Sequence, residues 1–210
     1  MTTDPVSTGT PNLIERAKNI LLQPKAEWER IAGEPANVSQ LYTGYVLPLV
    51  LISAICSFIG LTFIGVSAFG VTVRVPMTTG LVSLVLQVAM GLAGVYVLAL
   101  VANALAPNFG SVKDEGQAHK LAAYGSTAGF LAGVFAIFPP IAMLGILGLY
   151  SLALIYLGLP PLMKTPDDKR IGYFITIIVV MIVVWLVIGA VLGAVRASMG
   201  GMGGAPIVVG

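Results

Sequence analysis

Charged residues are scarce in this chain. They make up 10% of its 210 residues, whereas soluble globular proteins carry roughly 25%. With 57% hydrophobic residues and a mean hydropathy of +0.96, the chain has too few polar side chains to cover a water-facing surface. The net charge of +2 is too small to indicate a nucleic-acid-binding protein. The composition therefore predicts an integral membrane protein whose principal partner is the lipid bilayer.

Cysteine and histidine occur once each. Cys56 lies in an apolar run, so no intrachain disulfide forms and thiols do not indicate the compartment. His119 lies near Asp114 and Glu115, but one histidine and two loop carboxylates make a weak metal site. Ser111, Asp114 and Glu115 together are more typical of a helix start.

Carboxylates that suit catalysis are also missing. In Thr165-Pro166-Asp167-Asp168 the threonine fits the N-cap and the proline the first helical position, so the two acids indicate a helix start and not a catalytic pair. No charged residue or histidine falls at mid-depth in any predicted span, where a charge costs about 2.5–3.5 kcal/mol. We therefore predict a non-enzymatic protein without a metal or a cofactor.

Five apolar stretches are each long enough to cross a bilayer, which takes about 20 helical residues. They cover approximately residues 42–66, 78–105, 118–138, 140–159 and 171–195. The predicted fold is all-α, with five transmembrane helices in residues 41–196. Residues 1–11 are predicted to be a disordered tail, and the glycine-rich residues 197–210 a flexible one. Between the first two spans, residues 71–76 alternate like a short extended segment.

Residues 12–40 are predicted to form a cytosolic amphipathic helical segment. One helical face carries the apolar residues Leu13, Ala17, Ile20 and Leu21. Arg16 and the other polar residues fall elsewhere, and Pro24 restarts the helix ahead of Trp28. Such a segment either lies flat in the headgroup region, with tryptophan at the interface, or packs on the cytosolic end of the bundle. The pattern leaves both arrangements open.

The stretch from residue 121 to residue 163 is uncharged, and Phe138-Pro139-Pro140 lies near its middle. Proline lacks an amide hydrogen and disfavours helix in the residue before it. We therefore expect a tight hairpin of two spans that brings Lys113 and Lys164 to the same side.

Basic residues predict the orientation. Five spans place nine of the 11 lysines and arginines on the side of the N-terminus, and only Arg74 and Arg196 on the other. The positive-inside rule then predicts a multi-pass protein of the cytoplasmic (inner) membrane, with a cytoplasmic N-terminus and an extracytoplasmic C-terminus.

Glycines mark the predicted packing faces. They recur every four positions at Gly125, Gly129 and Gly133 in the third span and at Gly189 and Gly193 in the fifth. This spacing lets helix backbones approach closely, and we expect the third span to be the most enclosed. The faces serve either folding of the chain or formation of a homo-oligomer, and the sequence does not decide between them.

Gln87 is the most costly polar side chain to bury in the predicted spans. It either forms a hydrogen bond between helices or lines a path together with Asn103 and Tyr124. The second interpretation gives the alternative function, a small transporter or channel for lipid or a small polar solute.

Several motifs at the span ends are distinctive. They are Ile20 to Trp28, Leu105 to Gly110, Ala122 to Thr127, and the junction from Tyr156 to Pro160 and Leu162 to Pro166, with Asp168-Lys169 and Gly172-Tyr173. The chain resembles the Yip family (Ypt/Rab-interacting proteins) in its prokaryotic branch, from about residue 13 to about residue 195. The resemblance implies a five-span protein of a bacterial cytoplasmic membrane. Eukaryotic members of the family look like membrane scaffolds that bind small GTPases and one another.

The function we expect is to organise membrane or to recruit a membrane or cytosolic protein at the cytosolic face, where the motifs and nearly all charges lie. The candidate partner-binding residues are Trp28, Phe109, Gly110, Tyr124, Tyr156, Gly158, Pro160, Met163, Lys164, Pro166, Asp168, Lys169 and Tyr173.

Overall fold

The computed structural model describes residues 12–68, 71–198 and 208–209. Within these residues, five helical segments are long and apolar enough to cross a membrane, and we number them spans 1 to 5. They are Val38–Ile64, Met77–Phe109, Glu115–Ile137, Met143–Met163 and Asp167–Ala190. The predicted all-α, five-span membrane fold is confirmed. The predicted tail 1–11 and most of the tail 197–210 lie outside the described residues.

Two short helices precede span 1. Helix α1 (Leu13–Leu22) begins where the Asn12 side chain accepts a 2.8 Å hydrogen bond from the Glu15 amide. Helix α2 (Pro24–Gly33) begins at the predicted proline, whose fixed φ suits a first helical position. Span 1 is assembled from α3 (Val38–Leu41), the π-helical turn η1 (Tyr42–Val46), α4 (Leu47–Ile59) and a second π-helical turn η2 (Gly60–Ile64).

The remaining spans follow with short connections. Span 2 comprises α5 (Met77–Leu105) and the 3₁₀ turn η3 (Ala106–Phe109). Span 3 comprises α6 (Glu115–Gly125), α7 (Thr127–Ala132) and the 3₁₀ segment η4 (Gly133–Ile137). Span 4 comprises the last part of the 3₁₀ segment η5 (Pro139–Leu149) and all of α8 (Tyr150–Met163), and span 5 is the larger part of α9 (Asp167–Ser198).

Spans 3 and 4 form the predicted hairpin. Phe138 is extended, with φ −124° and ψ 96°, and separates η4 from η5. The two arms then pack side by side, α7 against η5 and α6 against α8. At the other end of the hairpin the Val112 amide donates a 2.8 Å hydrogen bond to the Met163 carbonyl. Lys113 and Lys164 therefore lie at the same end of the bundle, as the sequence predicted.

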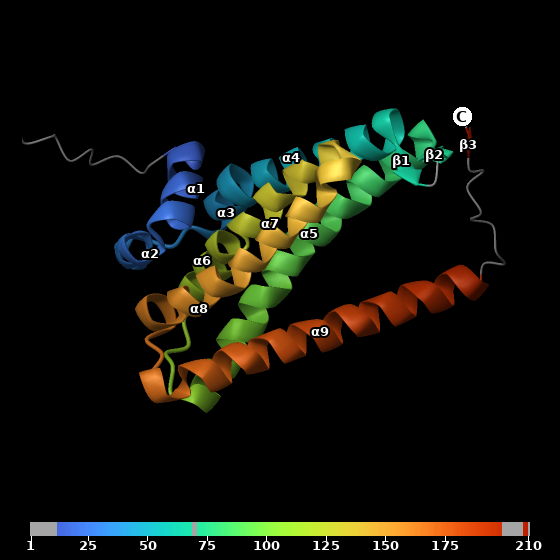
Figure 1. Ribbon diagram of the computed structural model, residues 1–210. Coiled ribbons are helices and arrows are strands. Elements are labelled where there is room, and N and C mark those ends of the chain that lie inside the picture. The colour runs from blue at the N-terminus through green and yellow to red at the C-terminus, as the bar shows by residue number, and fades with distance from the viewer. Residues whose placement is uncertain (1–11, 69–70, 199–207, 210) are drawn as a thin grey trace, which may run out of the picture.

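A small antiparallel sheet lies at the opposite end of the bundle from α1 and α2 (Figure 1). It consists of β1 (Val66–Ala68), β2 (Val71–Arg74) and β3 (Val208–Val209) in that order, with Val73 opposite both Val66 and Val209. The predicted extended segment is thus β2. The sequence assigned β3 to a flexible tail, because two residues carry no period-2 pattern to indicate a strand.

Span 3 is the most enclosed helix, as expected. In its most apolar 18-residue window 44% of the residues are buried, compared with 28% or less in every other span. Small side chains explain this, because Ala118, Ala122 and Ala123 are completely buried and let neighbouring helices approach. Helix α9 lies at the edge and diverges from the other spans (Figure 1), and only 11% of its window is buried.

The N-terminal helices pack on one end of the bundle (Figure 1). Ile20, Trp28 and Ile31 are completely buried, and α2 packs against α8. The apolar face of this segment therefore contacts protein, which corresponds to the second of the two arrangements that the sequence left open. The outer edge of α1 still exposes Ile14 and Leu22, at 76% and 69%.

Candidate functional site

Buried charges gather where α1 and α2 meet the bundle. Arg16 is only 3% exposed and Glu27 only 5%. The Arg16 guanidinium contacts the Glu27 carboxylate at 2.6 Å through Nη1 and the Glu34 carboxylate at 2.5 Å through Nη2. This ion network joins α1 to both ends of the α2 region, because Glu27 lies in the first turn of α2 and Glu34 directly follows its last residue.

The network corrects a prediction, since the helical pattern assigned Arg16 to the side away from the apolar face. Arg16 lies one turn before Ile20, and Glu27 lies one turn before Ile31. Residues four apart share a helix face, so both charges border the side that the two buried isoleucines occupy. Burial by itself lowers the pKa of Arg16. Its hydrogen bond to Glu34 and the nearby negative charges more than offset this, so the pKa is raised above its ordinary value and Arg16 stays charged.

Helix α6 holds the C-terminal end of α2. Lys120 is 4% exposed, and its ammonium group donates to the Ile31 carbonyl at 2.9 Å and also to the Glu34 carbonyl. Gln117 donates from its side chain to the Ala32 carbonyl at 3.2 Å. Carbonyls at a helix C-terminus have no partner within the helix and carry partial negative charge. A buried lysine is therefore well placed there, although the described contacts give it no carboxylate partner.

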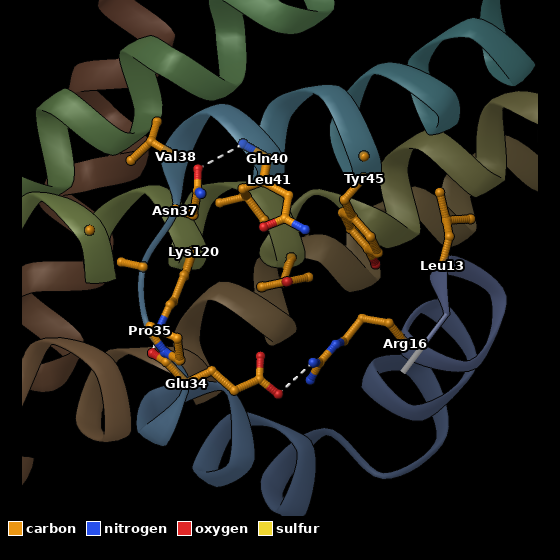
Figure 2. A pocket seen from close by; sticks show the side chains of 14 residues that line it. Leu13, Arg16, Glu34, Pro35, Asn37, Val38, Gln40, Leu41, Tyr45 and Lys120 are labelled. Carbon is orange, nitrogen blue, oxygen red and sulfur yellow. Dashed lines mark hydrogen bonds and ion pairs between the residues drawn. The ribbon is translucent and has the colours of Figure 1, made fainter. Parts of the chain in front are cut away.

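A cavity of about 190 Å³ lies between α1, α3 and α6 (Figure 2). The residues that line it are Leu13, Arg16, Glu34, Pro35, Ala36, Asn37, Val38, Gln40, Leu41, Gly44, Tyr45, Gly116, Lys120 and Tyr124. In Figure 2 the Arg16 and Glu34 side chains meet along one wall, and Lys120 lies near Glu34 and Pro35. Side chains of both charge signs therefore face one small space.

A tyrosine and histidine cluster continues from the cavity into span 3. The Tyr42 hydroxyl lies 3.0 Å from His119 Nδ1, and the Tyr45 hydroxyl lies 2.8 Å from Thr127 Oγ1. His119 is 1% exposed and its Nε2 lies 3.9 Å from Glu115. Ionisable side chains are thus buried in the first turns of span 3. The sequence had indicated only that His119 lies near two loop carboxylates.

The predicted helix start before His119 is present with a shifted cap. The Asp114 side chain caps α6 by accepting a 2.9 Å hydrogen bond from the Gln117 amide. Ser111 instead donates to the Thr165 hydroxyl at 2.9 Å, and Thr165 donates to the Leu159 carbonyl. Helix α9 begins at Asp167, one residue after Pro166. Across the described residues, no three histidine, cysteine or carboxylate side chains are grouped so that they could hold a metal ion.

The candidate partner-binding residues divide by exposure. Four of them are buried: Trp28, Gly158, Met163 and Tyr173. Tyr124, Tyr156 and Pro160 are half-buried. The remaining six lie at the end of span 2 and directly after it, at the junction before α9, or in the first turn of α9. Phe109 is half-buried and the other five are exposed. We call these six the junction surface: Phe109, Gly110, Lys164, Pro166, Asp168 and Lys169.

Contacts within the chain explain the buried group. A Cβ atom at Gly158 would lie 2.6 Å from Leu121 and 2.9 Å from the Trp28 ring. Only glycine therefore leaves room for Trp28 to dock on α8. Tyr173 stacks on Phe109 with ring centroids 5.1 Å apart, and its hydroxyl donates to the Ala102 carbonyl. These motif residues hold together the end of the bundle on which α1 and α2 pack.

The junction surface unites two loops that are far apart in the sequence. The Val112 amide bonds the Met163 carbonyl and Ser111 bonds Thr165. A Cβ at Gly110, whose φ is +66°, would lie 3.6 Å from Pro166 and 3.7 Å from the Lys169 ammonium. Arg170 is not among the predicted partner-binding residues, yet its guanidinium donates to the Tyr156 carbonyl at 2.7 Å and lies 3.8 Å from the centre of the Tyr156 ring.

The glycines of span 3 face neighbouring spans of the same chain. A Cβ at Gly125 would lie 2.6 Å from Ile155, and one at Gly133 would lie 1.9 Å from the Ser53 hydroxyl. The Gly129 amide donates to the Ser151 hydroxyl at 2.7 Å. A Cβ at Gly189 would have no neighbour within 4 Å, and the surroundings of Gly193 lie outside the described residues.

The residues of the alternative transport path do not come together. Gln87 and Asn103 lie 16 positions apart on α5, which is about 24 Å along a helix. Gln87 is exposed and borders a second cavity of about 60 Å³, near Thr62 and Ser83. That cavity shares no lining residue with the larger one, which Tyr124 lines. The Asn103 side-chain oxygen is buried without a hydrogen-bond partner among the described residues.

Apolar spans that meet lipid and a polar end define a polytopic α-helical membrane protein. A family model described as the Yip1 domain matches residues 18–188, most of the chain, which therefore belongs to this family. The resemblance found in the sequence is confirmed.

Curated relatives agree with this membership. The chain is 29% identical over 162 residues to Inner membrane protein YohC from Escherichia coli K12 and from Escherichia coli O6:H1. Each match covers 75% of this chain and 83% of the relative. No solved structure matches the chain.

Proposed function

We propose that this chain is a non-enzymatic protein of a bacterial inner membrane that recruits a protein partner through its junction surface. The observation that carries the proposal is the contact between the loop before α6 and the loop before α9. Ser111 and Thr165 lie 54 positions apart, yet their hydroxyls are hydrogen-bonded, and the exposed residues beside them form one surface. Nearly all other large exposed side chains of the spans are apolar and suit lipid.

The composition of the junction surface suits a protein partner. Lys164, Asp168 and Lys169 supply charges of both signs, and Phe109 and Pro166 supply apolar contact area. Lys164 adopts a left-handed conformation with φ 51°, which is uncommon for a residue with a side chain. The ordered backbone beneath it presents these side chains in a fixed arrangement, and preorganisation lowers the entropic cost of binding.

The proposed orientation places the junction surface, α1 and α2 in the cytoplasm. With five spans, nine of the 11 basic residues lie on the same side of the membrane as α1 and α2. By the positive-inside rule, this distribution supports a cytoplasmic location for that side. The name of the relatives from Escherichia coli supports an inner-membrane location. A reporter that is active only outside the cytoplasm should be active when fused after Gly210 and inactive when fused before Met1. The reverse pattern would contradict the orientation.

Site-specific photocrosslinking in living cells tests the recruitment proposal. A photoreactive residue at Asp168 should form a discrete protein adduct, because this position is exposed on the junction surface. The matched control is the same residue at Leu186, which is 66% exposed on the apolar part of α9 and should give lipid adducts only.

Charge reversal then tests whether the contact is specific. Lys164→Glu together with Lys169→Glu should abolish the protein adduct at position 168, while Lys25→Glu on α2 should leave it unchanged. Lys25 is also exposed, so the control reverses a surface charge outside the junction surface. Failure of position 168 to capture any protein, or an adduct that survives the double reversal, would refute recruitment through this surface.

A further inference from the structure

The cavity between α1, α3 and α6 borders the first turns of span 3. Gly116, Lys120 and Tyr124 line it within the first nine residues after Glu115, where span 3 begins. At 1.5 Å per residue these positions lie about 2–14 Å from the end of the span. The polar interface of a bilayer is about 5–8 Å thick on each side. With Glu115 at the membrane surface, the cavity would span the boundary between the two regions, whichever side of the membrane it faces.

Both charge signs line this space, and this restricts what it can bind. Arg16 and Lys120 are each less than 5% exposed, and both border the cavity. The Glu34 carboxylate borders it too, with its side chain 23% exposed. An anion alone would face the carboxylate, and a cation alone would face the two basic groups. A ligand with both charges satisfies the whole lining.

Hydrogen-bonding capacity remains unused in the cavity. The Lys120 ammonium has three donors and uses two of them on carbonyls of the α2 end. The Glu34 ion pairs both involve Oε1, and in Figure 2 the second carboxylate oxygen points away from Arg16. The Tyr124 hydroxyl has no hydrogen-bond partner among the described residues. One free donor, one free acceptor and one hydroxyl therefore border the same cavity.

We propose that this cavity binds the headgroup of a zwitterionic phospholipid that carries a phosphate and a primary ammonium group. The phosphate accepts from Lys120 and Tyr124, and the ammonium group donates to the free oxygen of Glu34. The volume of about 190 Å³ is smaller than the roughly 300–1,000 Å³ of pockets that enclose drug-sized molecules. It therefore holds a headgroup and leaves the acyl chains outside, and the cavity lining also includes the apolar side chains of Leu13 and Val38.

Native mass spectrometry of the purified full-length protein tests the proposal. After delipidation, the protein is incubated with phosphatidylethanolamine or with phosphatidylglycerol of the same acyl chains. The unmodified protein should retain phosphatidylethanolamine in preference. Glu34→Gln should reduce that preference about tenfold, because the ammonium group loses its charged partner. Lys120→Gln should weaken retention of both lipids about tenfold, because the phosphate loses a charged donor.

Two further variants separate binding from folding. Tyr124→Phe removes a hydroxyl that bonds to nothing in the described structure, so it should preserve the fold while lowering retention of both lipids severalfold. Lys25→Gln removes an exposed cation outside the cavity and should change nothing. Equal retention of the two lipids by the unmodified protein, or an unchanged preference in Glu34→Gln, overturns the proposal. Displacement of the lipid by an equal concentration of soluble glycerophosphoethanolamine overturns the assignment to a membrane lipid.

Discussion

Replacing Arg16 by methionine should detach the N-terminal helices from the bundle. The Arg16 and Glu27 side chains are 4% and 6% exposed, so the substitution leaves a carboxylate buried without its partner. Removing one member of a buried pair costs about 3–5 kcal/mol. At about 1.4 kcal/mol per tenfold change, the lower value already shifts the docking equilibrium about 100-fold.

The two companion variants should cost less, in a defined order. Glu27→Leu leaves Arg16 with Glu34, its second partner at 2.5 Å, so its cost should be smaller than that of Arg16→Met. The double variant removes both buried charges and leaves only Glu34, which water reaches because its side chain is 23% exposed. We expect it to lie within about 1 kcal/mol of the unmodified protein, since an apolar replacement of a buried pair is often neutral.

Tryptophan fluorescence provides the assay. The chain has two tryptophans. Trp28 belongs to α2 and is completely buried, whereas Trp185 is 42% exposed on α9. In a Trp185→Phe background, acrylamide quenching of Trp28 along a urea titration in detergent reports the docking of α2. If the double variant loses as much docking free energy as the two single variants together, the ion network does not stabilise the docking of these helices on the bundle.

Two further substitutions, each with a control, test contacts within the chain and are measured by thermal unfolding in detergent. Gly133→Ala should cost about 1–3 kcal/mol of stability, because its Cβ would lie 1.9 Å from the Ser53 hydroxyl. The control Gly189→Ala should be nearly neutral, because its Cβ would have no neighbour within 4 Å. Equal costs would contradict the packing of span 3. Tyr173→Phe removes the hydrogen bond to the Ala102 carbonyl and should cost about 1 kcal/mol. Tyr156→Phe removes a hydroxyl that has no hydrogen bond in the described structure and serves as its control.

Hydropathy and proline positions predicted most of the fold. The five spans follow from apolar runs of the required length, and Phe138-Pro139-Pro140 turns the chain because the backbone cannot continue a helix there. The glycines of span 3 were recognised as packing positions from their spacing, but spacing carries no information on the partner helix. That Gly133 faces Ser53 of span 1 and Gly125 faces Ile155 of span 4 depends on tertiary geometry.

The candidate site was much less predictable. The ion network joins Arg16 to Glu27 and Glu34, and Lys120 caps a helix 89 positions earlier in the chain. No local pattern encodes such distant pairs. Arg16 borders the apolar face by position, one turn before Ile20, but the sequence pattern assigned it, as a polar residue, to a different part of the helix. Likewise, a tryptophan such as Trp28 is typical of the membrane interface. Trp28 is buried in the protein because Gly158 has no side chain in the space that its ring occupies.

The docking of Trp28 against Gly158 has a consequence for biosynthesis. The ribosome completes α2 about 125 residues before it reaches Gly158, and at roughly 5–20 residues per second this interval lasts about 6–25 s. During that time Trp28 and the neighbouring apolar side chains of α2 lack the α8 surface that buries them in the folded protein. Docking of α2 is therefore a late step of assembly, because Trp28 reaches its buried position only after span 4 has been made.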